Sequence, residues 1–108
     1  MCKRTKFSFV LVSTLLSLQT AAANANNAHG LALVRGWCVE CHAITRGGRS
    51  PNTDAPSFAD LAAQNSTTKL SLGAFLRTPH PTMPNIIIKP DDADDIIGYI
   101  LSLRPGSK

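Results

Sequence analysis

Two cysteines and a histidine stand close together in the stretch WCVECH, at residues 37–42. Cys38 and Cys41 are three residues apart, and His42 follows directly. If this stretch is helical, the two thiols lie one turn apart on the same side. Each thiol can then add to one vinyl group of a porphyrin, and the histidine can reach the iron. The spacing C-x-x-C-H is therefore typical of covalent c-type haem attachment.

A zinc site and a redox dithiol are the alternative interpretations of this motif. A tetrahedral zinc site needs four ligands, and after residue 25 the chain has no further cysteine and only His29 and His80 besides. A thioredoxin-like dithiol needs a preceding strand within a βαβ unit, whereas a short helical pattern precedes Cys38. The sequence favours haem over both.

Met83 is the candidate for the second axial ligand of the haem iron. Met1 is the only other methionine, and prolines flank Met83 in the stretch PTMPN, which would hold its loop stiffly against a haem. A methionine opposite a histidine raises the reduction potential of a haem. The competing ligand is His80 in the same loop, which would lower the potential. The predicted metal ligands are thus His42 and Met83.

The first 25 residues have the order of features found in a secretory signal peptide. Three basic residues precede an apolar run at residues 7–18, and the small-residue stretch 21–25 follows. Cleavage after Ala25 fits this pattern, and cleavage after Ala23 fits nearly as well. We therefore expect residues 26–108 to form one exported domain, located in the periplasm.

The charge balance of the chain depends on this leader. The full chain has 11 Lys and Arg against 7 Asp and Glu, a net charge of +4. Three of the basic residues and none of the acidic ones lie in the leader, which leaves the remainder with +1. No basic surface for nucleic acid remains, and no later segment is long and apolar enough to cross a membrane. We expect neither a nucleic-acid partner nor stable membrane insertion after cleavage.

The elements that must position the candidate ligands are helices. Apolar residues recur at helical spacing in four segments, of which one has Ser57 as its N-cap and another has Pro90 in its first turn. The Gly- and Pro-rich segment 46–56 and the proline-rich segment 78–84 are predicted to be irregular. The fold class is therefore all-α. The predicted helices span residues 28–37, 57–64, 70–77 and 90–103.

Along the whole of residues 26–108, the chain resembles a class I (monohaem) cytochrome c of the small bacterial periplasmic type. CVECH matches the haem attachment motif, TMPN matches the distal methionine loop, and APSF at residues 55–58 is similar to the proline-bearing stretch on the histidine side. The resemblance implies a cytochrome c-like fold, with three to five helices around one haem c attached through Cys38 and Cys41. It also implies that the Pro56 carbonyl accepts a hydrogen bond from His42 and so sets the tautomer of the imidazole.

The resemblance further implies how the first and last helices meet. In the family, a glycine and a larger apolar residue of the first helix pack across an aromatic residue of the last helix. Gly30 and Val34 match the first pair, and Ile96 and Tyr99 match on the last helix. Val34 departs from the pattern, because many members carry an aromatic residue there. Four apolar residues are expected to line the haem, namely Trp37, Phe58, Phe75 and Leu76.

The expected function is the transfer of single electrons between redox proteins, with a dehydrogenase or reductase as donor and an oxidase or reductase as acceptor. Such a carrier is not an enzyme, and a monomer is expected. An alternative is a peroxidase or ligand-binding protein with an open sixth site on the iron, against which Met83 argues. A third interpretation is a dedicated subunit of a dehydrogenase.

Overall fold

The computed structural model describes residues 26–79 and 81–107, and the expected leader and His80 lie outside this part of the chain. The described residues contain helices and no strands. Residues 26–37 form the first helix, which α2 (Phe58–Ala63), α3 (Lys69–Arg77) and α4 (Pro90–Ser102) follow. The predicted all-α fold class is confirmed.

The local signals in the sequence explain where these helices begin. The Ser57 hydroxyl accepts a hydrogen bond from the backbone N–H of Asp60 and caps α2 as predicted. Thr68 and Ser71 form a reciprocal capping box at the start of α3, which begins at Lys69, one residue earlier than predicted. Pro90 occupies the first turn of α4, where its missing N–H costs no helical hydrogen bond.

The C-terminal end of α4 is capped from a distant loop. The Arg46 guanidinium donates to the carbonyls of Ser102, Leu103 and Arg104, at 3.0, 3.2 and 3.1 Å. These carbonyls lack partners within the helix, and a positive charge at this end also favours the helix dipole. The irregular segment after His42 is thereby fastened to the last helix.

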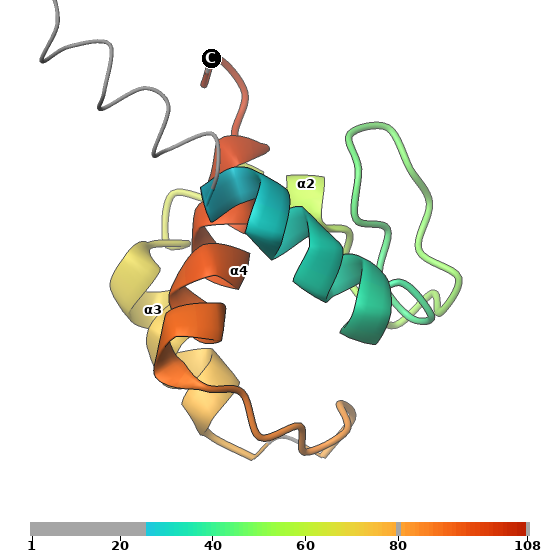
Figure 1. Cartoon of the computed structure of the whole chain (residues 1–108). Helices are drawn as coiled ribbons and strands as arrows, with labels where there is room; N and C mark the ends of the chain where they lie inside the picture. Colours follow the sequence, from blue (N-terminus) through green and yellow to red (C-terminus); the bar gives the residue numbers. More distant parts are fainter. Residues whose placement is uncertain (1–25, 80, 108) are drawn as a thin grey trace, which may run out of the picture.

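The first helix crosses α4, and α3 lies alongside α4 (Figure 1). At the crossing, Gly30 is buried against α4, and an added Cβ atom would collide with the backbone carbonyl of Asp95 and lie 2.9 Å from the Tyr99 Cβ. Val34 and Ile96 are almost fully buried in the same cluster. The contact between Gly30 and Tyr99, and the burial of Val34 and Ile96, agree with the packing that the resemblance implies.

The crossing also carries polar contacts. The Tyr99 hydroxyl donates to the Ile44 carbonyl at 2.7 Å in a buried position. His29 Nδ1 lies 2.7 Å from Asp95 Oδ2, with the imidazole half exposed. The core therefore joins the first helix, the segment after the cysteine motif and α4 into one unit.

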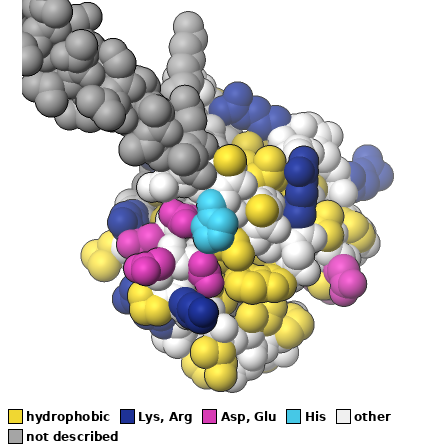
Figure 2. Space-filling view, viewed as in Figure 1, with side chains coloured by type: hydrophobic (Ala, Val, Ile, Leu, Met, Phe, Trp, Pro, Cys, Tyr) yellow, Lys and Arg dark blue, Asp and Glu magenta, His cyan; other side chains and the backbone are white. Residues whose placement is uncertain are grey.

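Several large apolar side chains remain on the surface instead of joining this core. Figure 2 shows hydrophobic side chains gathered on the face seen in Figure 1, beside a group of acidic ones. Ile87 is 95 % exposed, and Trp37, Val39, Leu70 and Phe75 are also exposed. None of the helices in the described ranges is long and apolar enough to span a bilayer.

Candidate haem-binding site

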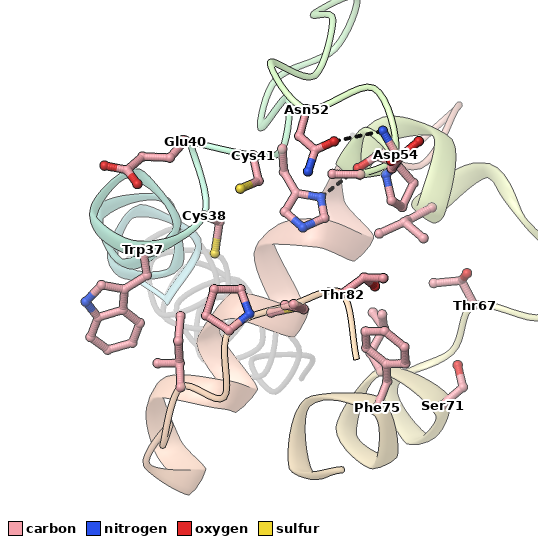
Figure 3. A pocket seen from close by; sticks show the side chains of 18 of the residues that line it. Trp37, Cys38, Glu40, Cys41, Asn52, Asp54, Thr67, Ser71, Phe75 and Thr82 are labelled. Carbon is pink, nitrogen blue, oxygen red and sulfur yellow. Dashed lines mark hydrogen bonds between the residues drawn. The ribbon is translucent and has the colours of Figure 1, made fainter. Parts of the chain in front are cut away.

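The cysteine motif continues the first helix by about one turn. The backbone N–H of Cys38 donates to the Val34 carbonyl at 2.9 Å, and that of His42 donates to the Cys38 carbonyl at the same distance. Both bonds span four residues, as in an α-helix. Cys38 and Cys41 are consequently about one turn apart, and Figure 3 shows their side chains beside the same space.

The two thiols are free, and neither forms a disulfide. Cys38 packs against the hydrophobic core, and its burial raises the pKa of the thiol to about 11. The side chain is therefore a neutral thiol at physiological pH. A disulfide would also have closed a very short loop and constrained little of the chain.

His42 is held by a hydrogen bond and a ring contact. Its Nδ1 lies 2.7 Å from the Pro56 carbonyl oxygen, which can only accept, so Nδ1 carries the proton. This tautomer leaves the lone pair on Nε2, the nitrogen that a metal can bind. The Phe58 ring lies 5.1 Å from the imidazole, centroid to centroid, and is tilted by 37°. The hydrogen bond that the resemblance implied is present in the structure.

The segment that supplies Pro56 is itself fastened next to His42. The Phe58 N–H donates to the Ala43 carbonyl at 2.9 Å, and the Ala43 N–H donates to the Ser50 hydroxyl at 3.0 Å. The start of α2 is thus tied to the residue that follows the histidine. The orientation of the imidazole depends on this loop as well as on the motif.

A cavity of about 650 Å³ opens beside the motif. Its size is within the range of cavities that hold cofactors and other small ligands. Most of the residues that the sequence predicted to contact the haem line this cavity. They come from the first helix, the cysteine motif, α3 and the methionine loop. The predicted site residues that line the cavity are Trp37, Cys38, Cys41, His42, Pro56, Phe75 and Met83.

Phe58 and Leu76 are placed differently from the expectation. Phe58 is buried behind the His42 imidazole and does not line the cavity. Leu76 packs against the core from α3 and is also absent from the lining. Both were expected to line the haem, but the sequence could not distinguish a side chain that faces the protein core from one that faces the cavity.

Met83 lies on a loop that forms a different wall of the cavity from the cysteine motif. Thr82, Met83, Pro84 and Ile86 all line the cavity, and Figure 3 shows Thr82 across the space from Cys41. The side chain of Met83 is half-buried. The loop thus brings the only sulfur atom outside the motif, within the described residues, to the same cavity.

Part of the lining had no signal in the sequence. Ser66 and Thr67, in the link between α2 and α3, line the cavity together with Ser71 of α3 and Asn52 of the loop after the motif. Their polar side chains lie at no recognisable spacing from the cysteines. Only the tertiary fold, which brings the link between α2 and α3 to the cavity, places them there.

The residues present fit a haem. Two thiols one turn apart, an imidazole with a free Nε2 and a thioether share one cavity, and Trp37 and Phe75 present apolar surface to it while remaining 43 % and 52 % exposed. Within residues 26–79 and 81–107, no three His, Cys, Asp or Glu side chains gather as a metal site made of such residues would require. A helical domain with this site has the side chains that a protein attaching its cofactor through cysteine requires.

Comparisons with known proteins identify the family. No family model and no solved structure matches the chain. A curated protein, cytochrome c-552 of Bradyrhizobium diazoefficiens, is 38 % identical over 95 residues, which cover 88 % of this chain and 91 % of that protein. The chain belongs to the small monohaem class I c-type cytochromes. The predicted family is confirmed, and with it a role in electron transfer.

Proposed function

We propose that the chain carries single electrons between redox proteins in the periplasm, through one haem c attached to Cys38 and Cys41 and ligated by His42 and Met83. The observation that carries this proposal is the shared cavity, which brings all four side chains together within a family of electron-transfer proteins. When bound, the haem supplies an iron that alternates between the ferric and ferrous states. The residues of the chain attach it, hold its ligands and exclude water from it.

The cysteines and the histidine would act as one unit. Helical hydrogen bonds hold Cys38 and His42 one turn apart, so attachment of the thiols would bring the imidazole to the iron. The bond from Nδ1–H to the Pro56 carbonyl keeps the proton on Nδ1 and directs Nε2 to the ligating role. Phe58 supports the ring from behind. Because these contacts do not depend on the charge of the iron, the site needs little reorganisation during electron transfer.

Met83 would close the other side of the iron. A thioether ligand opposite a histidine favours the ferrous state and raises the reduction potential. The apolar side chains of Trp37, Leu72 and Phe75 act in the same direction, because a low-polarity environment disfavours the more highly charged ferric site. If Met83 ligates the iron, no ligand position stays open for a substrate, and this supports an electron carrier over an enzyme.

The partners would be larger redox proteins, a donor dehydrogenase or reductase and an acceptor oxidase or reductase. Trp37 and Phe75 line the cavity and are partly exposed, so part of the cavity lining lies near the surface that a partner could approach. A small, transient interface suits repeated encounters with two partners. The proposal places the protein in the periplasm as a monomer, with residues 1–25 acting as the cleaved signal peptide.

Visible spectra and mass measurement of the exported protein test this proposal. The mature chain should have the mass of residues 26–108 plus one haem, and the ferric form should show the far-red band of methionine ligation. Met83→Ala should remove this band and lower the reduction potential, whereas Thr82→Ala, a change at the neighbouring cavity residue, should keep the band. A high-spin ferric spectrum in the unchanged protein, together with rapid CO binding by its ferrous form, would instead support a catalytic role.

The same spectra test the competing ligand. His80 lies outside the described residues, so its position carries no argument. A band that persists in Met83→Ala would remove Met83 from the proposed site. A bis-histidine spectrum that disappears in His80→Ala would assign the ligand to His80.

A further inference from the structure

Arg104, just after α4, ties together two segments far away in the sequence. Its Nε donates to the Ala62 carbonyl at 3.0 Å, and its Nη2 donates to the Thr67 carbonyl at 2.6 Å. Ala62 is fully buried in the last turns of α2, and Thr67 is buried in the link before α3. The planar guanidinium thus bridges two buried carbonyls with two fixed donors, which a single ammonium cannot reproduce.

The segment that Arg104 holds is a wall of the cavity. Ser66 and Thr67 line the cavity, and Figure 3 shows Thr67 and Ser71 together on one side of it, across from Trp37. The Ser71 hydroxyl donates to the Ser66 carbonyl at 3.1 Å, which couples the link to the first turn of α3. Because Phe75 stands one turn further along α3 and also lines the cavity, a shift of the link would move this whole wall.

Arg46 provides a matched contrast at the same end of α4. It also donates three hydrogen bonds to backbone carbonyls, but all of them belong to residues 102–104 at the end of that helix. None of these residues lines the cavity. One of the three carbonyls, that of Arg104, also accepts from the N–H and hydroxyl of Ser107 and keeps these donors if Arg46 is lost. Loss of Arg46 should therefore weaken the end of α4 and leave the cavity wall in place.

We propose that Arg104 is a positioning residue for the haem environment, and that its two-point bridge keeps residues 64–68 closed over the cavity and so raises the reduction potential. This inference rests on the proposed function. If the guanidinium is removed, the carbonyls of Ala62 and Thr67 lose the hydrogen bonds that it donates, and leaving them buried in this state costs free energy. The link would move outward to reach water, and water entering the cavity would favour the ferric state.

Two effects of Arg104 on the reduction potential can be separated, namely that of its hydrogen bonds to the cavity wall and that of its positive charge. A positive charge near the iron also favours the ferrous state, so loss of charge alone would lower the potential. Arg104→Lys keeps the charge but loses the fork, and Arg104→Gln loses both. If the bridge matters, the lysine variant should lower the potential together with the glutamine variant. If only the charge affects the reduction potential, the lysine variant should have the same potential as the unchanged protein.

The experiment uses the exported, haem-loaded protein and the pairs Arg104→Lys, Arg104→Gln, Arg46→Lys and Arg46→Gln. Amide hydrogen exchange at residues 66–68 should become about tenfold faster or more in both Arg104 variants, because a charged hydrogen bond restrains local opening by roughly that factor. The reduction potential should fall in both. The Arg46 variants should lower the unfolding midpoint while leaving amide exchange at residues 66–68 unchanged.

Two results would overturn the inference. Arg104 variants that lose stability but keep the potential and the exchange rates would make Arg104 a structural residue only. Arg46 variants that speed amide exchange at residues 66–68 by the same factor would make the effect a general consequence of loosening the end of α4. If the unchanged exported protein carries no haem, the proposed function itself is contradicted. A visible spectrum of that protein, recorded before the variants are compared, reveals this outcome.

Discussion

The helix crossing and the cavity wall use apolar residues in different ways. At the crossing, Gly30 lets the first helix contact the backbone of α4, and Val34 and Ile96 are almost fully buried between protein elements. Around the cavity, Phe75 is half exposed and Met83 is half-buried, although both side chains are apolar. The crossing is complete with protein atoms alone, whereas the cavity wall presents apolar surface that a cofactor would cover.

The two regions therefore contribute differently to the stability of this small domain. About 80 residues bury only a modest core. The crossing supplies the part of that core which needs no ligand, and it fastens the cysteine motif to α4 through Tyr99 and Ile44. The cavity wall, formed by α3, its preceding link and the methionine loop, depends on what it packs against. The predictions below disturb each region separately.

The largest effect is expected from removing the haem attachment. Cys38→Ala with Cys41→Ala should give a chain whose mass lacks the haem and whose helical circular dichroism is largely lost, because the apolar side chains that line the cavity then stay uncovered. Val39→Ala, a change at an exposed position between the cysteines, should retain haem and helicity. A double variant that stays well folded without haem would show that the crossing alone sustains the domain.

A smaller effect is expected from closing the gap at the crossing. The Cβ of Gly30→Ala would meet the Asp95 carbonyl and lie within 2.9 Å of the Tyr99 Cβ, so the helices must separate. The free energy of unfolding should fall by about 2–3 kcal/mol, as measured by guanidinium unfolding of the haem-loaded protein.

Gly36 provides the control in the same helix. An added Cβ there meets nothing within 4 Å. Gly36→Ala should therefore raise the unfolding free energy by about 0.5–1 kcal/mol, the helix preference for alanine over glycine. If Gly30→Ala and Gly36→Ala lower the free energy of unfolding equally, the loss does not depend on the close contact between Gly30 and α4.

The smallest loss of stability is expected from removing a single buried hydrogen bond. Tyr99→Phe removes the donor to the Ile44 carbonyl and should lower the unfolding free energy by about 1–2 kcal/mol near neutral pH. Burial raises the pKa of Tyr99, and the positive charge of Arg35 partly opposes this. The native state therefore holds the phenol proton to a higher pH than the unfolded chain, and stability falls as the pH rises above about 10.

The phenylalanine variant lacks this alkaline loss. The difference in unfolding free energy between the two proteins should consequently shrink above pH 10, where it can be measured by denaturant titration at a series of pH values. A constant difference across this range would mean that Tyr99 keeps its proton equally in the folded and unfolded states.

Much of the site was predictable from local sequence. The motif of Cys38, Cys41 and His42 identifies its own chemistry, because its spacing matches one helical turn, and the structure keeps helical hydrogen bonds through it. Ser57 was predictable as a cap because its hydroxyl bonds to a backbone N–H three residues away. The ligand role of Met83 remains a prediction.

Other features required the full chain path. Phe58 and Phe75 were both expected to line the haem, yet Phe58 lies against the histidine ring and Phe75 lines the cavity. Ser66 and Thr67 carry no recognisable signal, and the bridge from Arg104 to their segment joins residues about 40 positions apart. Such contacts depend on where the chain returns, which no local pattern encodes.

The sequence by itself determined the haem motif, the helical segments and the family to which the chain belongs, because each is written in residues only a few positions apart. Tertiary structure decided which apolar side chains meet protein and which face the cavity, how closely Gly30 approaches α4, and which arginine holds the cavity wall. The physical reason is range: caps and one-turn spacings act over a few residues, whereas packing is settled only when distant segments meet.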